Sequence, residues 1–352
     1  MVESSTAARP ERTTSSWLHR FAWLTAGVTF LLICSGGLVT SKGVGLAVPD
    51  WPTTFGYNMF LFPFSQWIGG IFYEHTHRLI ASTVGFMTII LAVWLWRADS
   101  RRWMRILGMV ALVTVVLQGV LGGLRVTMLK DEIGIFHACL AQAFLALLVF
   151  IALATSRLWG ASSGIRMCGR KSTRLALMIT ALIYLQLALG ASMRHQHRDL
   201  SILDFPTAYG DWIPDVSAER LAAINVSREK QALSEVTQFQ IWLQMAHRLV
   251  ALVITSGIVA FWFRLRLSSA KAPVLKGLSS FWTGLVFCQV MLGAWTIWSN
   301  KAADIATAHV AVGAIIFAVG VTISAILFRG ARGEGLLPAA RGPFTAQGVR
   351  VL

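Results

Sequence analysis

Residues 79–96 read LIASTVGFMTIILAVWLW, an uncharged and mostly apolar run bounded by Arg78 and Arg97. An α-helix of about 20 such residues, with a rise of about 1.5 Å per residue, crosses the hydrocarbon core of a lipid bilayer. Runs of the same kind, each bounded by polar or charged residues, recur along the chain. They predict eight membrane-spanning helices, at 21–41, 79–96, 106–124, 133–156, 175–193, 236–263, 277–300 and 305–328.

The composition of the whole chain fits a membrane protein. Of its 352 residues, 55% are hydrophobic and 13% are charged, and the mean hydropathy is +0.63. A soluble chain of this length would form roughly two domains and carry about a quarter charged residues. The composition therefore excludes a soluble protein, and the 14 tryptophans suit the headgroup boundary of a bilayer, where indole rings concentrate.

The charges predict which way the helices face. The chain has 31 Lys and Arg against 16 Asp and Glu, a net charge of +15. When alternate loops are assigned to opposite sides, the side with both termini has 20 of the Lys and Arg and the other has 9. The positive-inside rule therefore predicts cytoplasmic termini, and the charge needs no nucleic acid as a partner. Residues 1–20 are polar and contain Glu3 and Glu11, so we expect no cleavable targeting segment. The expected location is a bacterial inner (plasma) membrane, where lipid surrounds the helices.

The two halves of the chain repeat each other. DWPTTFG at 50–56 recurs as DFPTAYG at 204–210, and HRL at 77–79 recurs at 247–249. Because each half begins on the same side and contains four spans, the repeats are predicted to be parallel. The predicted fold is all-α, with two tandem parallel four-helix bundles at 21–156 and 175–328, a cytoplasmic linker at 157–174 and cytoplasmic segments at 1–20 and 329–352.

Four histidines occupy equivalent places in the repeats. His77 and His137 belong to the first half, and His247 and His309 to the second. Ionisable residues within membrane spans are costly and usually functional. Two neutral imidazoles on separate helices of a bundle can hold a haem iron from opposite faces of the ring. The competing interpretations are a single metal ion, which usually needs more than two protein ligands, and a hydrogen bond between helices.

The halves differ beside these histidines. Glu74 lies three residues before His77 on the same helix face, whereas Gln244 has the equivalent place in the second half. This difference indicates that the first half performs chemistry and the second stores or relays electrons; a Glu74 side chain in interfacial water is the alternative. Arg78 and Arg248, which directly follow their histidines, are candidates either to neutralise haem propionates or to reach lipid headgroups.

Other polar residues have less specific interpretations. Asp50 and Asp204 either line an outer rim or form a turn before the aromatic-Pro pair. His195 and His197 have no repeat partner, and we expect both to be solvated loop histidines. No pair of cysteines falls in an outer loop, so no disulfide is predicted. The acidic outer loop at 211–238 is interpreted as a solvated surface.

Together these motifs resemble haem A synthase, a family of membrane enzymes that convert haem O to haem A. The resemblance covers all eight spans, and its specificity comes from the order and spacing of the motifs. The chain departs from some members in having no cysteine pair in its outer loops. The motifs are GGLVT at 36–40, GL at 45–46, PDWP at 49–52, YEHTHRL at 73–79, GVLGG at 119–123, FHA at 136–138, AHRL at 246–249 and AHV at 308–310.

The resemblance implies a reaction and a role for each half. The ring-D (C8) methyl of haem O would be oxidised to a formyl group by successive hydroxylations through an alcohol, supplying haem A to terminal oxidases. His77 and His137 would hold the substrate haem, with Glu74 handling a proton or stabilising a cationic intermediate. His247 and His309 would be the iron ligands of a haem b that relays electrons.

Two other classes of protein would need the same four histidines. A di-haem electron-transfer cytochrome would move electrons and make no new molecule, and a haem transporter or chaperone would only hold its cargo. The cytochrome would not need Glu74. An enzyme also needs an electron donor, which the sequence does not identify, and haem O synthase or oxidase assembly factors are candidate docking partners.

Overall fold

The computed structural model describes residues 16–162, 169–196, 200–268 and 272–334. Within these ranges the protein is all-helical, with two isolated β-bridges and no strand. Eight of the described helices are long and apolar enough to span a membrane, which confirms the predicted number. They are α1 (Ser16–Ser41), α2 (Gly69–Ala98), α3 (Arg102–Met128), α4 (Asp131–Ala154), α6 (Gly169–Gln196), α8 (Gln238–Leu267), α9 (Pro273–Trp298) and α10 (Ala303–Glu334).

The helices extend beyond the apolar runs from which they were predicted. Helix α2 begins at Gly69, well before the run at 79–96, so Glu74, His77 and Arg78 all lie inside the helix. The reason is that a charge ends an apolar run in the sequence, whereas a helix continues as long as its backbone hydrogen bonds do. Local signals then mark the ends: Leu129 at φ 53° follows α3, and Pro273 is the first residue of α9.

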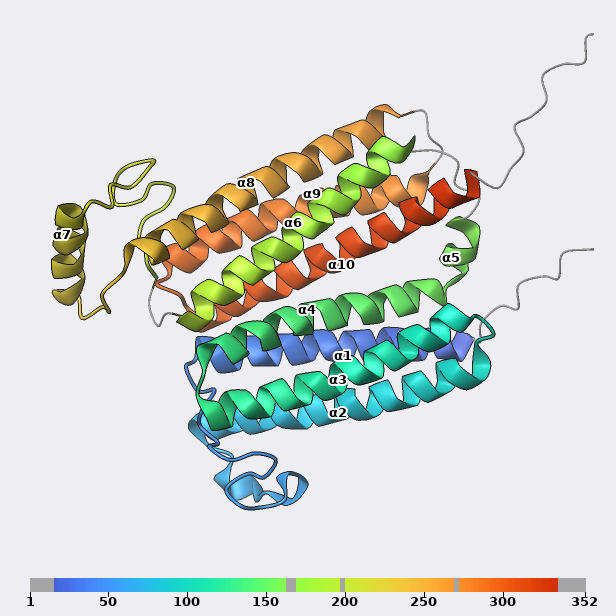
Figure 1. Ribbon diagram of the computed structural model, residues 1–352, viewed down its shortest axis with the longest axis horizontal. Helices are drawn as coiled ribbons and strands as arrows, with labels where there is room; N and C mark the ends of the chain where they lie inside the picture. Colours follow the sequence, from blue (N-terminus) through green and yellow to red (C-terminus); the bar gives the residue numbers. More distant parts are fainter. Residues whose placement is uncertain (1–15, 163–168, 197–199, 269–271, 335–352) are drawn as a thin grey trace, which may run out of the picture.

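The eight helices form two sets of four (Figure 1). In the first set, α1 and α3 each pack against both α2 and α4. In the second set, α8 and α10 each pack against both α6 and α9. The sets meet where α1 packs on α10 and where α4 packs on both α6 and α10. Helices α4 and α10 therefore each contact helices of both sets.

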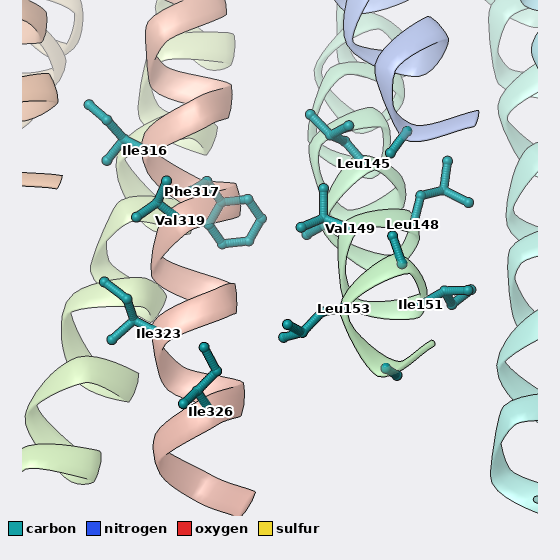
Figure 2. Close-up of a cluster of buried hydrophobic side chains, with 14 of the residues drawn as sticks. Leu145, Leu148, Val149, Ile151, Leu153, Ile316, Phe317, Val319, Ile323 and Ile326 are labelled. Atoms are coloured by element: carbon teal, nitrogen blue, oxygen red, sulfur yellow. The ribbon is translucent and has the colours of Figure 1, made fainter. Parts of the chain in front are cut away.

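The apolar core is concentrated on these two helices. Figure 2 shows Val149 and Leu153 on α4 pointing toward α10, and Phe317 on α10 pointing toward α4. A bilayer removes most of the hydrophobic drive for helices to associate, so close packing and hydrogen bonds between helices hold the sets together. One such bond runs from Trp282 Nε1 on α9 to the carbonyl of Ile316 on α10, at 2.9 Å.

The loops before α2 and α8 repeat the same turn. The carboxylate of Asp50 accepts hydrogen bonds from the Thr53 hydroxyl at 2.5 Å and from the amides of Phe55 and Gly56 at 2.8 and 2.9 Å. Asp204 accepts the equivalent bonds from the Thr207 hydroxyl and from the amides of Tyr209 and Gly210. Burial would raise the pKa of both carboxyl groups, but these donors outweigh it and lower both pKa values. The turn interpretation of the two aspartates is confirmed.

The acidic loop predicted for the outer side is a folded unit rather than only a solvated surface. It contains α7 (Ala218–Glu229), whose N-cap Ser217 accepts from the Arg220 amide. Arg228 is 2% exposed and donates to the carbonyls of Ser234 and Leu200, at 2.7 and 2.9 Å. Its small apolar core consists of Ile202, Ala208, Ile224, Val236 and Ile241. The shorter elements of the described chain are η1 (Met59–Leu61), η2 (Phe64–Gln66) and α5 (Arg157–Ser162), which lies in the predicted linker.

Candidate functional site

Each of the four repeated histidines packs its ring against a glycine of a neighbouring helix. The four histidines lie on α2, α4, α8 and α10, and the four glycines on α1, α3, α6 and α9. A Cβ added at any of these glycines would come close to Cε1 of the histidine ring, so the missing side chain is what makes room for the imidazole. The separations are 2.9 Å for Gly36 and His77, 3.3 Å for Gly122 and His137, 3.3 Å for Gly190 and His247, and 3.2 Å for Gly293 and His309.

The histidines form two pairs, as the sequence predicted. His77 interacts electrostatically with His137, and His247 with His309. The Nδ1 atom of each of the four rings is buried and has no hydrogen-bond partner. A buried polar atom left without a partner costs about 1–3 kcal/mol, and such atoms often mark a functional site. No three His, Cys, Asp or Glu in the described ranges come together as metal ligands, so two-ligand sites fit these residues better than a bare metal ion does.

Three of the histidines are also held through their backbone. A glutamine four residues before the packing glycine donates from Nε2 to the carbonyl of the histidine itself. The donor-acceptor pairs are Gln118 and His137 at 3.1 Å, Gln186 and His247 at 2.9 Å, and Gln289 and His309 at 2.9 Å.

The fourth histidine lacks this bond, because Leu32 stands four residues before Gly36. Gln118 and Gln289 match each other in the repeat at an offset of 171 residues, whereas Gln186 has Leu32 as its equivalent and was not predicted from the repeat. On three of the four helices that pack a glycine against a histidine, a glutamine lies four residues before that glycine. That spacing was visible in the sequence and was the signal that could have found them.

Glu74 and Gln244 anchor equivalent loops. Glu74 Oε2 accepts from the amide of Val48 at 2.9 Å, and Gln244 Oε1 accepts from the amide of Ile202 at 2.9 Å. Val48 and Ile202 each lie two residues before the aspartate of the repeated turn. Both side chains are buried, since Glu74 and Gln244 are each 3% exposed. The alternative that Glu74 lies in interfacial water is therefore wrong.

Arg78 and Arg248 also hold these loops. Arg78 donates to the carbonyls of Val48, Asp50 and Thr53, and from Nη2 to Glu74 Oε1 at 2.8 Å. Arg248 donates in the same way to Asp204 at 2.6 Å and Thr207 at 2.8 Å. Arg78 is only 9% exposed, so it does not extend to lipid headgroups. Both guanidinium groups use their Nη donors on loop carbonyls, and the propionate role predicted for them stays a prediction.

The expectation of solvated loop histidines was wrong for His195. This residue lies in the last turn of α6 and packs on α4, where a Cβ added to Gly134 would lie 2.7 Å from its Nδ1. Apolar runs end at charged residues, so the sequence could not show that α6 continues past Arg194. His197 lies outside the described residues. Cys34, Cys139 and Cys288 are free thiols, and Cys168 also lies outside the described part of the chain.

The fold and the site together define a multi-span membrane protein with two pairs of half-buried histidines on separate helices. The family model described as cytochrome oxidase assembly protein, COX15-CtaA, matches residues 19–321. The chain belongs to this family.

Curated relatives cover most of the chain at low identity. The heme A synthase of Geobacillus kaustophilus is 26% identical over 303 residues, which cover 83% of this chain and 86% of the relative. The heme A synthase of Shewanella oneidensis is 24% identical over 341 residues, with 89% and 96% covered. The heme A synthase of Shouchella clausii is 29% identical over 210 residues, with 58% and 68% covered.

Proposed function

We propose that this protein is a haem A synthase, a membrane oxidoreductase that converts haem O to haem A by oxidising the ring-D methyl group to a formyl group, through an alcohol. The observation that carries the proposal is the duplicated histidine pair with an acidic side chain beside only one copy. Family membership and relatives named heme A synthase support it. A terminal oxidase would use the product.

The two pairs take different roles in this proposal. His77 and His137 hold the substrate haem O, and His247 and His309 hold a resident haem b that supplies electron transfer when bound. The Nδ1 atom of each of the four rings is buried without a hydrogen-bond partner, and a neutral imidazole of this kind suits iron ligation. The glycine behind each ring and the glutamine behind three of them keep the imidazoles in place. Such outer partners orient the ligands of metal sites.

Glu74 is the proposed catalytic residue. Gln244 anchors its loop with a neutral amide, so the charge of Glu74 is not needed for anchoring alone. A buried carboxylate beside the substrate pair can take up or release a proton, or stabilise positive charge that develops at the methyl carbon. Arg78, which donates to Glu74 at 2.8 Å, holds the carboxylate in position.

The proposed setting is a bacterial inner membrane with both termini in the cytoplasm. The excess of Lys and Arg in one set of loops supports this orientation. With an even number of spans and a repeat of four helices, the two sets are then parallel. An electron donor is required, and haem O synthase or an oxidase assembly factor are the proposed docking partners.

The test is to purify the protein from cells that make haem O, extract the non-covalent pigment, and identify each haem by chromatography and mass. The same protein from cells without haem O synthase is the control. Haem b together with haem O, its alcohol or haem A is the expected result. Haem b alone, despite available haem O, would favour a di-haem electron-transfer cytochrome. A protein with no haem would overturn the interpretation of all four histidines.

A further inference from the structure

Three basic side chains meet near the first histidine pair and have no role so far. We call Arg125 on α3 and Arg194 and His195 on α6 the cationic cluster. Arg125 interacts electrostatically with His77 and His137. It also interacts with Arg194, and His195 interacts with both arginines. The cluster therefore joins the two sets of helices beside the first pair.

Arg125 is half-buried and has unused donors. Its guanidinium lies over Gly45 in the loop after α1, where an added Cβ would be 3.0 Å from Nη2 and 3.3 Å from Nη1. Glu74 and Asp131 attract it electrostatically. The ion pairs of the described residues are nevertheless Arg78 with Glu74 and Arg101 with Asp99, and Arg125 is in neither. It makes no hydrogen bond to the described residues either.

Arg194 and His195 hold the other side of the cluster. Arg194 donates from Nη2 to the carbonyl of Gly37 at 2.5 Å and to the Ser41 hydroxyl, which ties α6 to α1. The His195 ring packs on Gly134 of α4. The like charges of Arg125 and Arg194 repel each other, and the repulsion is larger where water is partly excluded. An anion between them would relieve it.

Arg125 has no basic counterpart beside the second pair, whereas Arg194 also interacts electrostatically with His309. Gln118 and Gly122 match Gln289 and Gly293 at one constant offset, and the same offset places Thr296 where the first set has Arg125. Arg78 and Arg248, the arginines shared by both halves, already donate to loop carbonyls. Arg125 is thus the arginine near His77 and His137 with free donors for a ligand.

We propose that the cationic cluster binds a carboxylate of the molecule held by His77 and His137, namely a propionate of haem O. This inference rests on the proposed function. A guanidinium is a planar fork that matches both oxygens of a carboxylate. Ring D of haem O has a propionate beside the methyl group that is oxidised, so binding that propionate fixes the position of the methyl. Arg125 is then a specificity-determining residue.

The test compares haem O with its dimethyl ester, in which both propionates are neutral. Full-length protein that holds its haem b is titrated with each compound, and binding is followed by absorbance. We expect the wild type to bind haem O about tenfold to a hundredfold more tightly than the ester, the range for charge-assisted hydrogen bonds. In Arg125→Gln this preference should fall to about one, with ester binding unchanged.

Arg102→Gln is the matched control, because Arg102 is an exposed arginine at the other end of α3. It should keep the wild-type preference. Haem b content reports whether each variant is folded. Arg125→Lys keeps the positive charge but not the planar guanidinium, so it should retain part of the preference for haem O over the ester. A folded Arg125→Gln protein that still prefers haem O to the ester would overturn this inference alone. A wild type that holds haem b but binds neither compound would overturn the proposed function and this inference with it.

Discussion

The two histidine pairs have the same framework and differ in three side chains. Each has a glycine behind every ring, an aspartate turn before the first histidine and a buried side chain that anchors the turn. The differences all lie beside His77 and His137. There the chain has Leu32, Glu74 and Arg125 where the second pair has Gln186, Gln244 and Thr296.

In the proposed function, these differences suit the second pair to holding a resident haem and the first pair to acting on a substrate haem. The second pair has the fuller set of hydrogen bonds, since both its histidine carbonyls accept from a glutamine. The first pair has one such bond, at His137, together with a carboxylate and a free guanidinium. A permanent cofactor benefits from rigid ligands, whereas a substrate has to enter, be oriented and leave.

The largest expected effect comes from removing one ligand of the second pair. His247→Ala should lose haem b almost completely and keep haem O at the first pair, because the two pairs lie on different sets of helices. Pigment extraction and chromatography measure both. His77→Ala is the reciprocal variant, and it should keep haem b. Loss of both haems from either variant would contradict the assignment of one haem to each pair.

Glu74→Gln tests the charge difference directly. Glutamine can accept the Val48 amide as Gln244 accepts that of Ile202, so the loop and both haems should remain. If Glu74 takes part in the reaction, conversion of haem O should fall by about a hundredfold or more. The ratio of haem A to haem O in the purified protein measures this. Unchanged conversion would show that the charge of Glu74 serves only its pairing with Arg78.

Gly36→Ala tests whether the space that Gly36 leaves for the His77 ring matters for haem binding at the first pair only. The new Cβ would lie 2.9 Å from the His77 ring, and overpacking of about 1–3 kcal/mol should lower haem O affinity about tenfold or more. Haem b should stay. Gly27→Ala on the same helix is the control, because nothing lies within 4 Å of its new Cβ. Equal effects of the two variants would contradict the claim that Gly36 makes room for the His77 ring.

Leu32→Gln should have the smallest effect and make the first pair more like the second. A hydrogen bond between membrane helices contributes about 0.6 kcal/mol on average, so haem should leave the first pair about threefold more slowly. Transfer of haem to an excess of an apo-haem protein measures the rate. Gln186→Leu is the reciprocal variant and should loosen haem b by a similar factor. A faster release from Leu32→Gln would contradict the role given to this position.

Much of the fold and the histidine pairs follow from features that are local in sequence. Apolar runs predict spans because each span must be long and uncharged, whatever its neighbours are. The aspartate turn recurs at an offset of 154 residues, HRL at 170, and His137 as His309 at 172. These features predicted the eight helices and the equivalence of Glu74 with Gln244, and they identified the histidines that lie together.

Contacts between side chains from different helices could be learned only from the tertiary structure. From the sequence, Arg125 and Arg194 are charges that end apolar runs, and His195 follows as an expected loop residue. They meet because helix rotation and register, set by close contacts at Gly45, Gly134 and similar positions, bring α3, α4 and α6 together. The sequence by itself determined the membrane class, the repeat and which histidines are equivalent. Tertiary packing decided which donors are used on loops and which stay free for a ligand, because that depends on distances between residues far apart in the chain.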